Sequence, residues 1–192
     1  LYEEKVSATL GANFIDMSLK GGLIGIVLVM LFMIVYYRLP GFVASLALIF
    51  YAALVLALFK LIPVTLNLAG IAGFIISVGM AVDANVLMFE RLKEELRAGR
   101  TVKAAIEACF DRAWPAIRDS NVTTFVACII LYWLGSSIAA SAAVMGFAIT
   151  LFIGVAVSMF TAIIVTRILL RLFVVTHLAQ RVSLFTAYAG KG

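Results

Sequence analysis

Long apolar segments separated by short polar breaks dominate this chain, and they predict helices that span a membrane. Residues 21–37 carry no charge and, with a turn added from residues 14–19, are long enough for a first span. The Arg-Leu-Pro-Gly sequence at 38–41 ends that segment, because proline stops a helix and glycine permits a turn. Phe42–Phe59 is predicted as the second span and Thr65–Phe89 as the third.

A charged segment at residues 90–120 separates the third predicted span from the rest. Thr101 is a plausible N-cap for a short helix, and Trp114-Pro115 is expected to mark the return into the bilayer. One face of that helix is apolar and comprises Val102, Ala105, Ile106, Cys109 and Ala113. We therefore expect an amphipathic helical pair that lies along the membrane surface.

The last long apolar stretch provides room for two more spans. No formal charge occurs between Asp119 and Arg167. The fourth span is predicted at Ala116–Leu134 and the fifth at Ala142–Phe173, joined at the Gly-Ser-Ser sequence of residues 135–137. The fold class is therefore an all-α membrane protein with five transmembrane helices and an amphipathic connection between the third and the fourth.

Composition and charge agree with this class and set an orientation. Hydrophobic residues make up 65% of the chain and charged residues 13%, which is typical of an integral membrane protein in a lipid bilayer. Every basic residue except Lys5, Lys20 and Lys60 falls on one side of the predicted spans. The positive-inside rule makes that side cytoplasmic, with the N-terminus outside and the C-terminus inside. Residues 174–192 are then a cytoplasmic tail.

One acidic residue lies within the third predicted span. Asp83 is surrounded by apolar residues, and an ionised Asp at the centre of a membrane helix costs roughly 2.5–3.5 kcal/mol. Such a residue needs a partner, a water-filled crevice or the neutral state, and we expect Asp83 to take up and release a proton. Gly79 precedes it by one turn on the same face, and Asn85 follows it by two residues. The glycines of this span can also serve helix packing alone.

Other polar residues and the remaining chemistry are less informative. Thr124 and Asn121 lie in the fourth predicted span, where such side chains bond to the backbone, bond across helices or line a proton path. Cys109 and Cys128 are interpreted as free thiols. No phosphate-binding loop, metal cluster or nucleophile–base set is readable, so we expect no enzyme, metal or cofactor. Acidic residues interleave the basic ones, which argues against nucleic-acid binding.

Several motifs resemble the SecD family of the bacterial protein-translocation machinery, in the resistance-nodulation-division superfamily. The resemblance covers nearly all of residues 6–173. SecF, the partner family, carries a different sequence around its acidic centre. One departure is the sequence SAAVMGFA at 141–148, where the family usually has a Gly-Pro-x-basic-Gly-Phe-Ala pattern. The matching segments are SATLGANFI, YYRLPG, GMAVDANVLMFERLKEELRAGR, SNVTT and SMFTAIIVTRILLRL.

The resemblance implies a location, partners and a role that the residues alone do not. It implies a bacterial inner-membrane subunit that works with SecF beside the SecYEG channel, where SecA drives the preprotein. The family uses the proton motive force, and its proton-carrying acid corresponds to Asp83. It also implies a periplasmic domain and a sixth span upstream, so a chain that starts at Leu1 is interpreted as a fragment whose residues 1–20 lead out of that domain.

Two alternatives remain open at this stage. One is a proton-driven exporter half of the same superfamily that moves lipids or small hydrophobic molecules. The other is a membrane scaffold subunit in which Asp83 only bonds to a neighbouring helix. No lysine or arginine occurs in the middle of a predicted span, so a cation that pairs with Asp83 must come from another chain, and SecF is the candidate.

Overall fold

The computed structural model describes residues 8–62, 64, 67–137 and 142–175, and every regular element in these residues is helical. The predictions for residues 1–7, the outer connection at 138–141 and the tail at 176–192 lie outside this description. The elements in chain order are α1 (Ala8–Tyr37), α2 (Leu39–Leu61), α3 (Leu68–Arg97), α4 (Val102–Ser137), α5 (Ala142–Phe160), the π-helical segment η1 (Thr161–Val165) and α6 (Thr166–Val175).

The predicted number of membrane spans is confirmed. Within the described residues, five helical stretches are long and apolar enough to cross a bilayer. The fifth combines α5, η1 and most of α6 into one stretch at Ala142–Phe173, as predicted from the sequence. The five stretches are Asn13–Tyr37, Leu39–Leu61, Leu68–Arg97, Val102–Ser137 and Ala142–Phe173.

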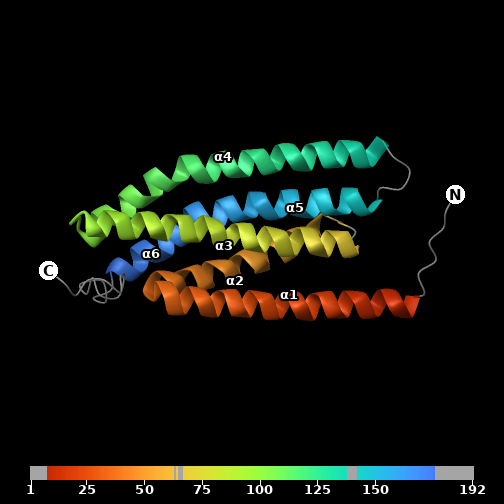
Figure 1. Cartoon of the computed structure of the whole chain (residues 1–192), viewed down its shortest axis with the longest axis horizontal. Coiled ribbons are helices and arrows are strands. Elements are labelled where there is room, and N and C mark those ends of the chain that lie inside the picture. The colour runs from red at the N-terminus through yellow and green to blue at the C-terminus, as the bar shows by residue number, and fades with distance from the viewer. Residues whose placement is uncertain (1–7, 63, 65–66, 138–141, 176–192) are drawn as a thin grey trace.

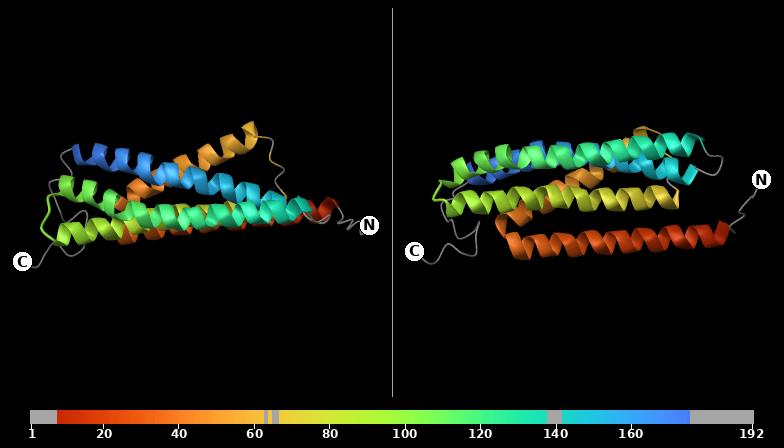
Figure 2. Two further views of the ribbon diagram at one scale, coloured as in Figure 1. Left: turned by 90° about the horizontal axis from the view of Figure 1, so that it is seen from above. Right: turned by 45° about the horizontal axis from the view of Figure 1, so that its top comes forward.

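The helices form two layers. Figures 1 and 2 show α1, α3 and α4 side by side in one layer, with α3 in the middle, while α2 and α5 cover the other side. The most extensive contact is between α3 and α5, and the contact of α3 with α1 is much smaller. The central helix α3 is therefore firmly packed against α5, also contacts α4 along its own layer, and is loosely packed only on the side of α1.

Glycine permits the close approach of α3 and α5. A Cβ atom at Gly73 would lie 2.5 Å from Thr150 Oγ1 and 2.9 Å from the carbonyl oxygen of Phe147. Further along, a Cβ atom at Gly154 would collide with Ser77, whose Oγ lies 2.6 Å from the Tyr51 hydroxyl of α2. The predicted role of glycine in packing is thus confirmed at Gly73. We call this contact the α3–α5 seam.

The break between the first two spans follows the prediction. Arg38 adopts a positive φ of 55°, and Pro40 occupies the first turn of α2. Gly41 packs directly against the backbone of Met33, where any Cβ atom would collide with the carbonyl group. Glycine is required here because it lets α2 fold back tightly onto α1.

The connection between α3 and α4 differs in part from the prediction. Residues 90–97 continue α3 without a break, Gly99 makes the turn with φ of 83°, and Thr101 caps α4 as expected, since its Oγ1 accepts a hydrogen bond from Ala104 N. The helix that starts after Thr101 is not short and separate from the fourth span as expected, because it runs through Trp114 and Pro115 as one continuous helix. The predicted position along the membrane surface stays a prediction.

The physical reason for the continuous helix is its buried face. Ala105, Ile106, Cys109 and Ala113 are buried, as the sequence predicts, and Ile117 continues the same stripe beyond the proline. Pro115 itself is exposed, so it lies outside the buried stripe. The lost backbone bond bends α4 without ending it, and Figure 1 shows this curvature near its N-terminal end.

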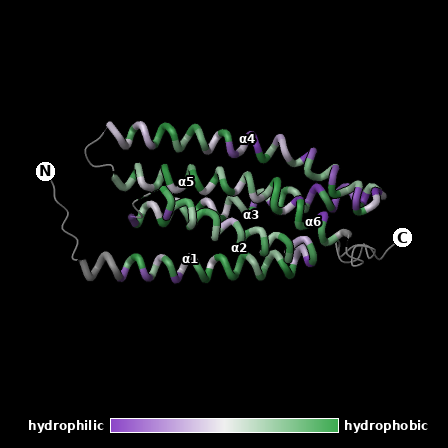
Figure 3. The backbone as a smooth tube through the Cα atoms, turned by 180° about the vertical axis from the view of Figure 1, so that it is seen from behind, coloured by the Kyte–Doolittle hydropathy of each residue, from purple (hydrophilic) through white to green (hydrophobic). Residues whose placement is uncertain are grey.

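Hydrophilic residues gather at the end of the bundle where α3, α4 and α6 meet (Figure 3), and several of them are charged. Glu95 is 2% exposed and lies 2.9 Å from Arg100 and 2.5 Å from Arg112, so it joins α3, the turn and α4. Glu107 of α4 pairs with Arg167 and, at 2.7 Å, with Arg171 of α6. These ion pairs fasten the helix ends together on the side that the sequence analysis assigns to the cytoplasm.

Candidate proton site

Asp83 lies deep within the third span. It is 15 residues beyond the start of α3 at Leu68, which at about 1.5 Å per residue places it about 22 Å along the helix. A hydrocarbon core is roughly 30 Å thick, so a helix that enters at Leu68 holds Asp83 inside the core. The charged residues that begin at Glu90 lie about 10 Å further on.

Two grooves meet at Asp83. The α3–α4 groove has a volume of about 200 Å³, and the α1–α3 groove has a volume of about 300 Å³. The α3–α4 groove is lined by Met80, Asp83, Ala84, Leu87, Ala116, Ile117, Ser120 and Asn121. The α1–α3 groove is lined by Gly21, Gly22, Gly25, Ile26, Val29, Ile75, Val78, Gly79, Val82 and Asp83. The acid is thus the one residue that the two linings share.

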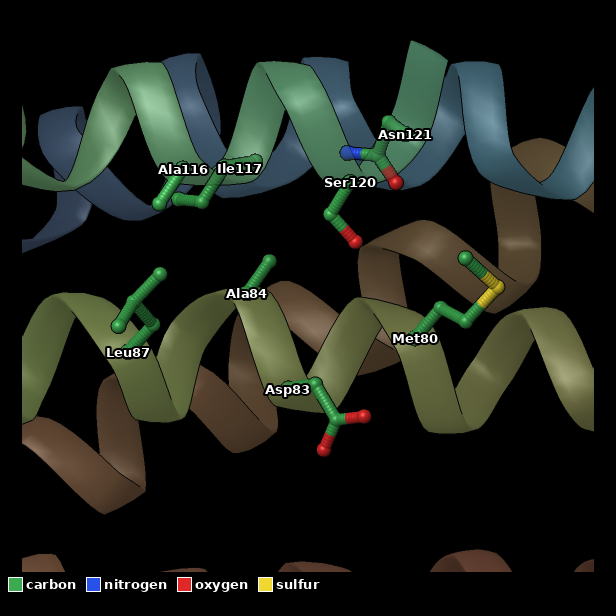
Figure 4. Close-up of a pocket in the computed structure, with 8 residues that line it drawn as sticks. All are labelled: Met80, Asp83, Ala84, Leu87, Ala116, Ile117, Ser120 and Asn121. Atoms are coloured by element: carbon green, nitrogen blue, oxygen red, sulfur yellow. The ribbon is translucent and has the colours of Figure 1, made fainter. Parts of the chain in front are cut away.

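The carboxylate is directed away from α4 in this conformation. In Figure 4, Ser120 and Asn121 point from α4 toward α3, whereas the Asp83 side chain lies on the opposite side of α3. Asp83 is exposed in the isolated chain, and among the described residues it makes no hydrogen bond or ion pair. A neutral acid needs less compensation in this setting than an ionised one, which needs water or an incoming cation.

Asn85 lies on the other side of the same helix and is bonded inside the bundle. Its side chain is 4% exposed, and its Nδ2 donates to the carbonyl oxygen of Ala81 at 3.1 Å. Its Oδ1 accepts a hydrogen bond from Thr166 Oγ1 at 3.0 Å. Asn85 therefore supports the site from the back of α3 and does not contact the groove-facing acid.

The remaining predicted site residues have different positions. Gly79 lines the α1–α3 groove with Asp83, and a Cβ atom there would meet nothing within 4 Å, so within this chain it keeps the groove open and packs no helix. Thr124 donates to the carbonyl oxygen of Ser120 in its own helix at 3.3 Å and lines neither groove. The structure therefore brings Gly79 and Asp83 together and leaves Thr124 apart.

Two residues near the site were missed by sequence reasoning. Ser120 was not singled out, although it opens the polar SNVTT sequence that enters the fourth span. Thr166 was not singled out either, and it is fully buried at the junction of η1 and α6. The signal for Thr166 is its five-residue spacing from Thr161, which departs from the α-helical period and fits a π-helical turn.

The structure thus defines a multi-pass helical membrane protein whose central span carries a groove-facing acid. The family described as "Protein export membrane protein SecD/SecF, C-terminal" matches residues 1–175, and the chain belongs to it.

The chain is similar to curated SecD subunits over most of its length. It is 67% identical over 186 residues to "Protein translocase subunit SecD" of Dehalococcoides mccartyi strain VS, which covers 97% of this chain and 41% of the relative. It is 66% identical over 166 residues to the SecD subunit of Thermobaculum terrenum, covering 86% of this chain and 32% of the relative. The chain therefore spans less than half the length of these relatives.

A solved structure has the same arrangement of helices. SecDF from Thermus thermophilus, described as a translocon-associated membrane protein, matches with a TM-score of 0.80 and 39% identity over 85% of this chain and 22% of that chain. A second SecDF structure, in a super-membrane-facing form, matches with the same TM-score. These findings confirm the resemblance to SecD and identify the chain as its C-terminal membrane region.

Proposed function

We propose that this protein is a non-enzymatic auxiliary subunit of the Sec protein-export translocase. In this role it assists preprotein translocation across the bacterial inner membrane and draws on the proton motive force. The family membership and the names of the curated relatives support the translocase assignment. Because the chain spans less than half of those relatives, the activity of the whole protein belongs to the proposal.

The proton step is assigned to Asp83, and the observation that carries it is the position of this acid. It lies within a membrane span, where the two grooves meet, without a partner among the described residues. The α1–α3 groove lies alongside the half of α3 nearer its N-terminus, and the α3–α4 groove extends toward its C-terminal half. A carboxyl group that faces each groove in turn exchanges a proton with each side of the membrane.

The available energy limits what one proton does. One elementary charge that crosses 100 mV supplies about 2.3 kcal/mol, whereas unfolding a typical domain costs about 5–15 kcal/mol. Proton transfer therefore biases a change between helix arrangements, and it does not unfold the exported protein. In this account the subunit ratchets a preprotein that is already unfolded and that SecA drives through the SecYEG channel.

The exposed face around Asp83 fits a partner in the membrane. We place SecF against the layer of α1, α3 and α4, where it supplies a cation to the acid, which pairs with none among the described residues. The SecDF neighbours support this pairing. The N-terminus is placed on the periplasmic side and the charged end of the bundle in the cytoplasm, in line with the positive-inside rule.

The test compares two aspartates in the full-length protein with its partner, in inverted inner-membrane vesicles. Asp83→Asn is expected to remove the increment of preprotein translocation that depends on the proton motive force, while the complex still assembles and translocation driven by SecA and ATP continues. Asp16→Asn is the matched control, because Asp16 is exposed and pairs with Lys20 near the other end of the bundle.

Full stimulation with Asp83→Asn would refute the proton role and favour the scaffold alternative. The exporter alternative would require transport of a lipid or small hydrophobic molecule by vesicles that lack Sec components. A carbodiimide that modifies protonated carboxyl groups in apolar surroundings gives a second measurement. It is expected to label Asp83 in the unmodified protein and to lose that site in the Asp83→Asn variant.

A further inference from the structure

Thr166 occupies a junction that the proton step does not use directly. It is the first residue of α6, it is fully buried, and it follows the π-helical segment η1. We propose that Thr166 is a positioning residue that couples the protonation of Asp83 to a movement of α6, through its hydrogen bond to Asn85. This inference rests on the proposed function of Asp83.

The hydrogen bonds around Thr166 have defined roles. Asn85 Nδ2 is engaged by the carbonyl oxygen of Ala81, so its Oδ1 is the end that faces α6. The Thr166 hydroxyl has one hydrogen, and it lies 3.0 Å from Asn85 Oδ1 and 3.3 Å from the carbonyl oxygen of Thr161. The shorter contact crosses between helices, and the longer one stays within η1. The side chain therefore links α3 to the carbonyl group at the start of the π-helical turn.

The segment η1 makes the junction a natural place for movement. Its hydrogen bonds run from residue i to i+5, and the backbone N–H of Thr166 donates to the carbonyl oxygen of Thr161. Such turns are rare, occur often at functional sites and interrupt the regular ladder of an α-helix. The segment η1 therefore joins two regular helices, α5 and α6, and can change its register between them. Of these two helices, α5 is held in the α3–α5 seam.

Asn85 follows Asp83 by two residues, which turns it about 200° around α3 at 3.6 residues per turn. Asp83 therefore faces the grooves while Asn85 faces η1 and α6. A rotation of α3 that carries the acid from one groove toward the other moves Asn85 in the opposite direction. Thr166, bonded to Asn85, then transmits that movement to α6.

The other end of this link is an ion-pair cluster. Arg167, the next residue, and Arg171 both pair with Glu107 of α4. Arg167 also lies over the ring of Phe110, with 5.4 Å between its guanidinium carbon and the ring centroid. α6 is thus held by α3 through one neutral hydrogen bond and by α4 through charged contacts. The neutral bond is the weaker of the two, and Asn85, which accepts it, lies on the same helix as the acid, two residues further on.

The experiment uses the full-length protein with its partner in inverted membrane vesicles. Thr166→Val removes the hydroxyl and keeps the shape, and Thr166→Ser keeps the hydroxyl. Thr161→Val is the matched control, because Thr161 is 3% exposed and its hydroxyl, within the described residues, donates only to the carbonyl oxygens of Val157 and Ser158 in the preceding turn. Asp83→Asn is included in every series.

We expect Thr166→Val to lose most of the translocation increment that depends on the proton motive force. Carbodiimide labelling of Asp83 and translocation driven by ATP alone are expected to stay at the unmodified level. Thr166→Ser is expected to restore the increment, and Thr161→Val is expected to retain it. Retained labelling shows that the variant is folded and that Asp83 still binds the proton. A lost increment then shows that protonation of Asp83 no longer drives translocation.

Three results would overturn the inference while leaving the proton role of Asp83 intact. They are a full increment with Thr166→Val, an equal loss with Thr161→Val, and a loss of Asp83 labelling with Thr166→Val. If Thr166→Val does not accumulate, Asn85→Leu removes the same bond from the other helix and is read by the same criteria. A full increment with Asp83→Asn would instead refute the proposed function itself.

Discussion

The tight α3–α5 seam makes a quantitative prediction for two glycines of one helix. Gly73 is buried in the seam, and Gly79, less than two turns later, faces the α1–α3 groove. A Cβ atom at Gly73 would lie 2.5 Å from the Thr150 hydroxyl and 2.9 Å from the backbone oxygen of Phe147, whereas ordinary contacts begin near 3.4 Å. Gly73→Ala therefore forces the two helices apart by roughly half an ångström to one ångström.

The neighbours of Gly73 have little freedom to yield. Thr150 is fully buried, and its hydroxyl donates toward the carbonyl oxygens of Gly146 and Phe147, each at 3.0 Å. The second obstacle is backbone, which moves only with the whole of α5. Overpacking of this kind costs about 1–3 kcal/mol, and we expect that loss in the free energy of unfolding. Gly79→Ala meets nothing within 4 Å, and we expect a change within about 0.5 kcal/mol.

The two cysteines provide the assay. Cys109 and Cys128 are each 1% exposed and are free thiols at two levels of α4, so a thiol-reactive dye reports unfolding of the chain purified in detergent. For a domain of this size, 1 kcal/mol corresponds to a shift in the melting temperature of about 2–4 °C. The account of the seam would be refuted if Gly73→Ala had the melting temperature of the unmodified protein. It would also be refuted if Gly79→Ala lowered the melting temperature as much as Gly73→Ala.

Two further substitutions test the interior and the charged end with the same melting assay. Tyr51→Phe removes the hydroxyl that bonds to Ser77, and we expect a loss of about 0.6 kcal/mol, with about 1.7 kcal/mol as the upper bound for such bonds in membranes. An unchanged melting temperature would show that this bond contributes nothing. Glu95→Gln removes the buried carboxylate between two arginines, and we expect a loss of roughly 1.5–3 kcal/mol that shrinks little in high salt, because Glu95 is buried. If high salt abolished the loss of stability, the ion pairs of Glu95 would not be buried as described.

The spans and the first turn were predictable because each depends on local properties. Five apolar stretches of sufficient length specify five spanning helices, since a bilayer leaves a backbone few other ways to satisfy its hydrogen bonds. The turn at Arg38–Gly41 and the cap at Thr101 are specified by residues within a few positions of the break. The acid was recognisable for a related reason, because Asp83 is the only charged residue between Lys60 and Glu90.

Other features depend on contacts between distant residues and could not be predicted in that way. Pro115 is a strong local stop signal, and only the buried stripe that continues through Ile117 explains why α4 passes it. Asn67 caps α3 while its Nδ2 bonds to the carbonyl oxygen of Ala142 in α5, which pairs residues far apart in the chain. The link from Asn85 to Thr166 is likewise visible only once α3 and α6 are placed together.

These contacts also restrict where the proposed proton-driven movement takes place. A proton supplies about 2.3 kcal/mol per 100 mV, which exceeds one interhelical hydrogen bond in a membrane at about 0.6 kcal/mol. It is small against separating α3 from α5, where Gly73 lies against the backbone of α5 and Gly154 lies against Ser77 of α3. In the α1–α3 groove, by contrast, Gly79 and Gly25 meet no neighbour. In the proposed cycle the seam at Gly73 and Gly154 is therefore the fixed element. The part of α3 beyond it, which carries Asp83 and Asn85, shifts against α1 and α4 and pulls on η1 through Thr166.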